Sequence, residues 1–117
     1  MSYTVSQLAT AVLRHLSVID ANESADSADE TYISDVWSAK WEELSGHGME
    51  LTYFSYDEIP NPVFLIIRDL VALEVQGAFG QPITPADKEA HEQIILRRLR
   101  RHVQVQGTQN SARANYF

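Results

Sequence analysis

The chain has 117 residues, enough for one domain with one hydrophobic core. Apolar residues make up 44% of it, a fraction that supports a folded core, and the absence of cysteine excludes disulfides, thiolate zinc sites and cysteine nucleophiles. The amino terminus lacks the basic start and apolar centre of a signal peptide. The longest mostly apolar run, residues 63–75, contains three charged residues and is too short to span a bilayer. These features predict a soluble protein made in the cytoplasm.

The net charge of -7 is unevenly distributed along the chain. Residues 1–60 contain eleven acidic residues against Arg14 and Lys40, whereas residues 61–117 contain seven basic and five acidic residues. A chain this acidic is poorly suited to nucleic acid, because its long-range field repels phosphates. The uneven distribution fits subunits that meet acidic half to basic half, and it fits a plain solvated surface equally well.

Hydrophobic spacing and capping residues predict four helices. The first begins at Thr4, which can form a capping box with Gln7. Its expected buried stripe has the three-and-four spacing of an amphipathic helix and consists of Val5, Leu8, Ala9, Val12, Leu13 and Leu16. A loop over residues 17–27, rich in Ser, Ala, Asp and Asn, separates this helix from the second.

The second helix is expected to begin near Ser27, with its hydroxyl as the cap, and to end at Gly46 and Gly48. Lys40 falls within its apolar arc, where a lysine usually lays its methylene stem on the core and extends its ammonium into water. The arc itself consists of Ile33, Val36, Trp37, Trp41 and Leu44. Residues 49–56, rich in Tyr, Phe and Thr, favour a short extended segment between the second and third helices.

The third helix is expected to start with Asn61 as its N-cap and Pro62 at the first helical position, and to run to Phe79 before Gly80. It is apolar almost all round apart from one narrow polar strip, formed by Arg68, Asp69 and Gln76. A domain of this size surrounds one helix only thinly, so we expect its burial to be shared with neighbouring subunits.

The fourth helix begins at Thr84 and Pro85, a second cap-and-proline start. One of its sides is apolar, with Ile95, Leu96, Leu99 and Val103, and the other is basic, with Arg97, Arg98, Arg100 and Arg101. Residues 104–117 are polar and aperiodic, which predicts an extended tail that is disordered in isolation and ends in two anchoring aromatic residues. The prediction is an all-α four-helix bundle over residues 1–103, followed by a docking tail over residues 104–117.

The sequence offers little catalytic chemistry. Its four histidines, His15, His47, His91 and His102, have no recognisable metal-ligand spacing. The adjacent carboxylates at residues 42–43 and 57–58 point apart on a helix and are expected on a solvated face. There is no phosphate-binding glycine loop and no Gly-x-Ser-x-Gly nucleophile elbow. We therefore expect a protein that is not an enzyme and that uses no metal or cofactor.

The arginine cluster over residues 97–101 is the strongest electrostatic feature, and three interpretations remain open. It can be a solvated helical face, favoured by the helix dipole near a carboxyl end. It can dock on an acidic protein surface, such as residues 20–35 of another subunit. It can contact DNA phosphates, although the overall charge counts against this interpretation.

The order of these features resembles the head-tail adaptor, or tail accessory, proteins of tailed phages and the similar subunits of gene transfer agents. The matching elements are the opening TVSQLATAVLRHL helix, the Asp- and Ala-rich loop before a helix with Trp37 and Trp41, and the IPNP entry to an apolar helix that ends in AFG. A further helix and a polar tail complete the order. The resemblance covers essentially the whole chain and rests on helix order and a few loose positions rather than on a strict motif.

This resemblance implies a structural protein of the virion, placed at the head-tail interface. The family's helical subunits form a twelve-membered ring beneath the portal protein, so the implied partners are the portal, other copies of the chain and tail-side connector or tail proteins. Genomic DNA would pass through the ring without specific binding, and no membrane is involved. The implied portal-docking residues are Arg113, Asn115, Tyr116 and Phe117, and the arginines Arg97, Arg98, Arg100 and Arg101 are expected at contacts between subunits.

Two other classes of function remain open. One is a small helical DNA-binding or regulatory protein that uses the arginine-rich helix, which strong, salt-sensitive binding to duplex DNA would favour. The other is a helical subunit of a cellular complex, which the absence of portal and terminase genes beside its own gene would favour.

Overall fold

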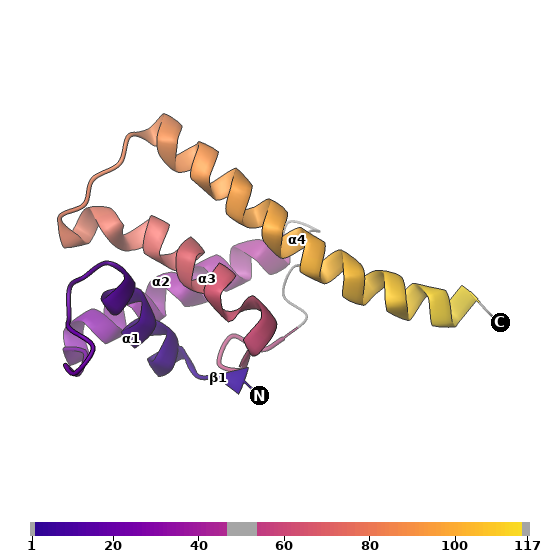
Figure 1. The fold of residues 1–117 in the computed structure, drawn as a ribbon, viewed down its shortest axis with the longest axis horizontal. Coiled ribbons are helices and arrows are strands. Elements are labelled where there is room, and N and C mark those ends of the chain that lie inside the picture. The colour runs from indigo at the N-terminus through magenta and orange to yellow at the C-terminus, as the bar shows by residue number, and fades with distance from the viewer. Residues whose placement is uncertain (1, 47–53, 116–117) are drawn as a thin grey trace.

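Four helices make up most of the fold (Figure 1), which confirms the predicted all-α class. The computed structural model describes the backbone of residues 2–46 and 54–115, and side chains through His102. In chain order the elements are β1 Ser2–Tyr3, α1 Val5–His15, α2 Ser27–Gly46, β2 Ile59–Pro60, α3 Asn61–Val75, the 3-10 helix η1 Gln76–Phe79, and α4 Pro85–Asn115. α3 contacts each of the other three helices and forms the centre of the bundle.

The start of α1 is held by three hydrogen bonds. The predicted capping box is confirmed: Gln7 N donates to Thr4 Oγ1 at 3.2 Å, and Thr4 N donates to Gln7 Oε1 at 2.8 Å. Val5 N donates to Asp57 Oδ1 at 3.0 Å, so the carboxylate from a distant segment accepts from the helix end. The predicted stripe of α1 is buried in the core, which confirms the assignment of its inner face.

The predicted start and apolar face of α2 are also confirmed, although the cap contact comes from Asp26, whose Oδ1 accepts from Ala28 N at 3.4 Å, rather than from Ser27. Both tryptophans of this face also hold the segment that follows the helix. Trp37 Nε1 donates to Tyr56 O at 2.7 Å, and Trp41 Nε1 donates to Phe54 O at 3.1 Å. Both acceptors are backbone carbonyl oxygens, so α2 holds residues 54–56 through their backbone.

The structure describes only part of the extended segment predicted over residues 49–56, and that part is not a strand. Residues 49–53 and Gly48 lie outside the described residues, and residues 54–56 form no strand. The short β2 comes later and pairs antiparallel with β1, in the register Ser2 with Pro60 and Tyr3 with Ile59. Ile59 is fully buried, so the strand is anchored in the core at that position.

The predicted N-cap role of Asn61 is wrong. Asn61 is already inside α3, Pro60 occupies the cap position, and no side chain caps the helix. The Asn61 Oδ1 atom instead accepts a hydrogen bond from the Tyr3 hydroxyl at 3.1 Å. The Tyr3 ring stacks on Phe64 with centroids 4.0 Å apart, so β1 and the start of α3 are joined by both contacts.

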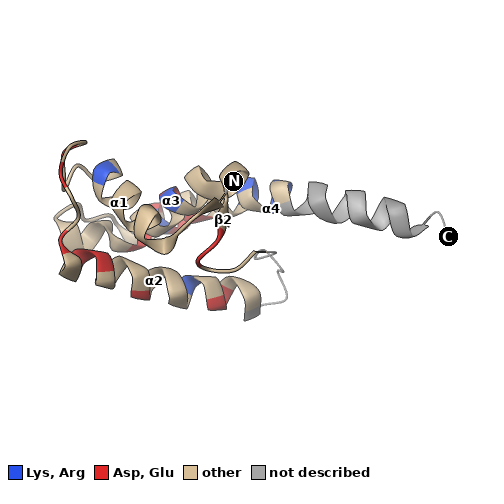
Figure 2. Ribbon diagram, turned by 90° about the horizontal axis from the view of Figure 1, so that it is seen from below, with Lys and Arg blue, Asp and Glu red and all other residues tan. Residues whose placement is uncertain are grey.

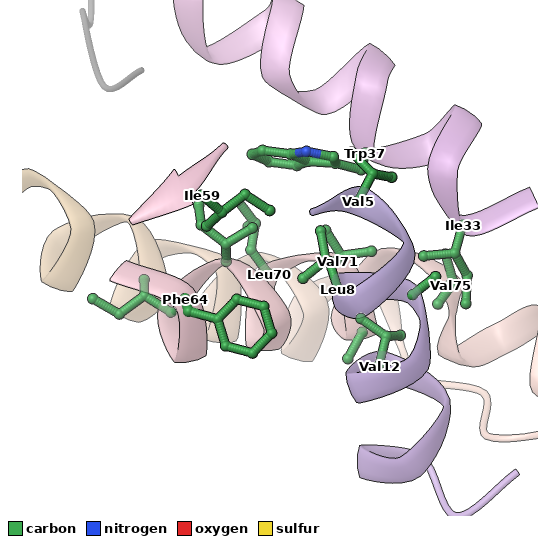
Figure 3. Packing of buried hydrophobic residues seen from close by; sticks show 14 of the residues in the cluster. Val5, Leu8, Val12, Ile33, Trp37, Ile59, Phe64, Leu70, Val71 and Val75 are labelled. Atoms are coloured by element: carbon green, nitrogen blue, oxygen red, sulfur yellow. The ribbon is translucent and has the colours of Figure 1, made fainter. Parts of the chain in front are cut away.

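α3 is buried mainly by its own chain, which corrects the expectation of burial shared with other subunits. Nine of its side chains are buried, and Figure 3 shows Leu70, Val71 and Val75 packed among side chains of α1 and α2. α4 covers a further side of the helix. Leu65 is the exception, with 54% of its surface exposed. The other three helices therefore suffice to cover α3, which has only 15 residues.

α4 begins as predicted, with Asp87 N donating to Thr84 Oγ1 at 3.3 Å. It then continues to Asn115, so the backbone of residues 104–115 is helical where the sequence predicted an extended tail. Extending an existing helix avoids the cost of nucleation, and Gln, Ala and Arg in this segment have good helix propensity. Figure 1 shows the last part of α4 projecting beyond the other three helices.

Candidate functional site

The most buried charge among the described residues is Lys40 of α2, which is only 7% exposed. Its ammonium was expected in water but lies between carboxylates: Nζ is 2.7 Å from Glu92 Oε1 of α4 and 3.1 Å from Glu74 Oε1 of α3. Glu43 Oε2, one turn along α2, is also 3.1 Å away, and Lys88 Nζ lies 3.1 Å from Glu74 Oε2. The Lys40 cluster thus connects α2, α3 and α4.

Burial alone would lower the pKa of Lys40, but its hydrogen bonds to Glu92, Glu74 and Glu43 outweigh this effect and raise the pKa above its ordinary value. Burial would likewise raise the pKa of Glu74, yet the hydrogen bonds from Lys88 and Lys40 lower it. Both groups therefore stay charged at neutral pH. A protonated lysine is not a nucleophile, so the arrangement is suited to holding helices together rather than to covalent catalysis.

The arginine face of α4 is the predicted site that the structure describes best. Leu96 and Leu99 point into the core as predicted, whereas Arg97, Arg98 and Arg101 are exposed. Arg100 is partly buried. In the part of the chain with described side chains, the ion pairs of this face involve Arg98 alone.

Arg98 is held by α3. Its NH1 atom lies 3.3 Å from Asp69 Oδ2. Asp69 also pairs with Arg68 at 2.8 Å and has His15 Nε2 at 3.8 Å. Arg98 is therefore engaged by a carboxylate of its own chain, and the expected role of the arginines between subunits stays a prediction.

A groove of about 280 Å³ opens where α4 passes the beginning of α3. Its lining combines cationic and apolar groups, chiefly Asn61, Leu65, Ile66, Arg98, Arg101 and His102. Leu65 is the exposed apolar residue of α3 noted above, and it lies in this same groove. The basic groove therefore offers both charge and apolar surface to a ligand.

Two further surface grooves have other linings. One, of about 330 Å³, borders the stacked Tyr3 and Phe64 rings and Arg14. The other, of about 410 Å³, brings His15 and His91 to the same depression beside Asp69. Nevertheless, no group of three or more potential metal ligands occurs among the described residues.

The acidic half of the sequence forms an exposed surface on α2, where acidic residues recur along the helix (Figure 2). Asp29, Tyr32 and Asp35 follow one another at intervals of three, which places them on one side of the helix. Asp35 is exposed, Asp29 is partly exposed, and Tyr32 is 41% exposed. This acidic stripe carries an aromatic ring between two carboxylates.

The predicted portal-docking residues cannot be placed at a site. The backbone of Arg113 and Asn115 belongs to α4, but their side chains lie outside the described ones, and Tyr116 and Phe117 lie outside the described residues altogether. Their role stays a prediction from the family resemblance.

Sequence reasoning missed two kinds of residue. Asp57 is exposed, as expected, but its hydrogen bond from the start of α1 was not predicted, because a contact across 52 positions leaves no local pattern. The carboxylate partners of Lys40 were missed for the same reason. The only available signal was a lysine inside an apolar arc, which requires either water or acidic partners.

Comparisons with known proteins gave no match, whether with family models, with curated proteins or with solved structures. Within the described residues, the structure contains no helix that combines the length and apolar character needed to cross a membrane.

Proposed function

We propose that this protein is a structural adaptor of a tailed phage or phage-like particle, joining head to tail as a ring of copies beneath the portal. In this role it extends the DNA channel and offers an attachment surface to the tail proteins. The protein acts by binding, without catalysis, metal or cofactor.

The observation that carries the proposal is the shape of α4. This helix has 31 residues, but the described side chains that it packs in or against the core are Ile95, Leu96 and Leu99, near its middle. Beyond His102, which still lines the groove beside α3, the backbone of residues 103–115 continues the helix for about 20 Å at 1.5 Å per residue. The molecule is accordingly elongated, with extents of 53 × 33 × 22 Å. A compact body with one projecting arm suits a subunit that reaches a neighbouring protein.

The residues at the end of this arm suit protein binding. The segment is followed by Tyr116 and Phe117, and aromatic residues contribute large contact areas at a low entropy cost. The order of helices, which resembles the adaptor family, supplies the identity of the partner as a portal. The binding of both aromatic residues to the portal is part of the proposal.

The experiment is a binding measurement between the protein and the purified portal ring encoded beside it. We expect wild type to bind and the variant without residues 105–117 to lose binding. The double variant Tyr116→Ala and Phe117→Ala should lose most of it, whereas the control Gln109→Ala and Asn110→Ala, on the same arm, should bind nearly normally. Full portal binding by the deletion variant would contradict the docking model.

One observation favours DNA binding as a second candidate. Arg97 and Arg101 are exposed on one helix and, in the described part of the chain, form no ion pair. The net charge of -7 opposes this candidate, since most of the surface field repels phosphates. Salt-sensitive binding of duplex DNA, lost in Arg97→Glu and Arg101→Glu, would establish it.

A further inference from the structure

The basic groove has the chemistry of a site for an acidic, aromatic protein segment. Arg98, Arg101 and His102 supply hydrogen-bond donors along one edge, and Leu65 supplies an apolar surface that is 54% exposed. An exposed apolar residue surrounded by cationic groups favours a ligand that combines carboxylates with a large apolar side chain. Arg101 is exposed and, in the described structure, free of an ion pair, so it is available to such a ligand.

The acidic stripe of the same protein has the complementary composition. Its two carboxylates, Asp29 and Asp35, flank Tyr32 along one side of α2. The Tyr32 ring makes an edge contact with Phe79, at a centroid distance of 6.2 Å, and keeps 41% of its surface exposed. Tyrosine buries apolar area and also offers a hydroxyl, a combination that is enriched in protein interfaces.

These two surfaces cannot meet within one subunit. Tyr32 contacts Phe79, which lies beyond the carboxyl end of α3, whereas the groove is lined by Asn61 at the beginning of α3. The 15 residues of α3 separate the two positions by about 20 Å. Figure 1 shows the beginnings of α2 and α3 at opposite ends of the bundle.

We infer that the acidic stripe of one copy docks into the basic groove of the next, with Tyr32 against Leu65 and the carboxylates of Asp29 and Asp35 facing Arg101, Arg98 and His102. Because the two surfaces differ and lie apart, the contact is head to tail and can repeat around a closed ring. The inference rests on the proposed ring of copies and names the interface from which that ring is built.

A charge-exchange experiment tests this interface. Sedimentation velocity at low salt should show concentration-dependent association of wild type that weakens as salt is added, since exposed charges are screened. Arg101→Glu and Asp35→Arg should each raise the dissociation constant about tenfold or more, because each places like charges opposite one another. Mixing the two variants in equal amounts should restore association, as each then offers the surface that the other lacks.

Two controls separate the contact from a general effect of charge. Arg14→Glu changes an exposed arginine on α1 outside the groove, and Glu89→Arg changes an exposed acid on α4 outside the stripe. Both should associate like wild type. The interface is contradicted if wild type is monomeric throughout at low salt, if the controls weaken association equally, or if the mixture fails to recover. Binding of duplex DNA in the groove without self-association would also overturn it.

The interface and the proposed function can fail separately. If only the inferred interface is wrong, the protein still binds the portal through the α4 arm, but Arg101→Glu, Asp35→Arg and their mixture do not change self-association as expected. If only the proposed function is wrong, the two charge variants weaken self-association and their mixture restores it, but neither wild type nor any variant binds the portal.

Discussion

Lys40 shows how a single buried charge can determine the packing of three helices. Removing the buried ammonium takes the ion-pair partner of Glu92 away and leaves Glu74 with Lys88 alone, and an unpaired, partly buried carboxylate is costly. Because Glu74 and Glu92 keep about a quarter of their surface exposed, we expect Lys40→Met to lower the free energy of unfolding by about 2–4 kcal/mol. Urea denaturation measures this loss.

Lys88 provides the matched control for this prediction. It pairs with the same Glu74 carboxylate, but its side chain is 37% exposed. Lys88→Met should therefore cost less than about 1 kcal/mol, as is usual for exposed ion pairs. Equal losses in the two variants would show that burial at Lys40 does not strengthen the cluster.

Glu74 makes the stability of the protein depend on acid pH. Its pKa is lowered from 4.5 in the folded protein, so its contribution is fully present above that pH and is lost as the pH falls through the lowered pKa. The pKa of Lys40 is raised, so the contribution of Lys40 persists throughout this range. We expect Glu74→Gln to be less stable than wild type at pH 7, and the difference to shrink well below pH 4.5.

Urea denaturation at both pH values checks this prediction. Glu89→Gln, which neutralises an exposed carboxylate on α4, should change stability little at either pH. If the difference between wild type and Glu74→Gln were the same at both pH values, the cluster would not be the source of the acid sensitivity.

Local signals in the sequence predicted the helices well. The capping box at Thr4 and the Thr84 cap were both found, because each joins residues three positions apart. The start of α2 at Ser27 was also found, although its cap contact comes from Asp26. Contacts between distant segments were not predicted. The Tyr3 hydroxyl donates a hydrogen bond to the Asn61 side chain, and the pairing of β1 with β2 joins residues nearly sixty positions apart.

The extent of α3 burial was also misjudged from the sequence. A helix that is apolar almost all round is expected to be buried, but its sequence does not identify the surface that covers it. Within this chain, α1, α2 and α4 cover most of the helix, and Leu65 is left for the groove. The groove itself could not be predicted, because it combines side chains of α3 and α4 that are more than thirty positions apart.

The arm of α4 is expected to matter for binding and not for the stability of the body. Deleting residues 105–117 removes none of the core side chains that the structure describes, the last of which is Leu99. The melting temperature should therefore change little while portal binding is lost. Thermal unfolding followed by circular dichroism measures the first effect, and a large fall in melting temperature would show that the arm packs on the body.

Arg113→Ala offers a finer test of the arm. If Arg113 makes an exposed charge contact with the portal, its loss should weaken binding less than loss of the two aromatic residues does. The effect should also shrink as salt is added, because exposed charge pairs are screened. An effect that salt leaves unchanged would point to a buried contact instead.

The whole molecule combines a stable body with contacts that are weak one by one. The described core is built from side chains of all four helices of one chain, so we expect the chain to fold without a neighbour. The surfaces assigned to assembly are polar and partly charged, and such contacts between isolated copies are weak at physiological salt. We therefore expect the isolated protein to be monomeric or weakly associated and to form a ring only where the portal brings copies together.

Native mass spectrometry of the portal, with and without this protein, is the most direct test of the proposed ring beneath the portal. Each bound copy adds 13.2 kDa, so the mass of the complex counts the subunits. We expect the protein alone to be mainly monomeric and the portal to gain a full ring, twelve copies if it follows the family that the chain resembles. A portal whose mass does not change in the presence of excess protein would contradict the proposed function.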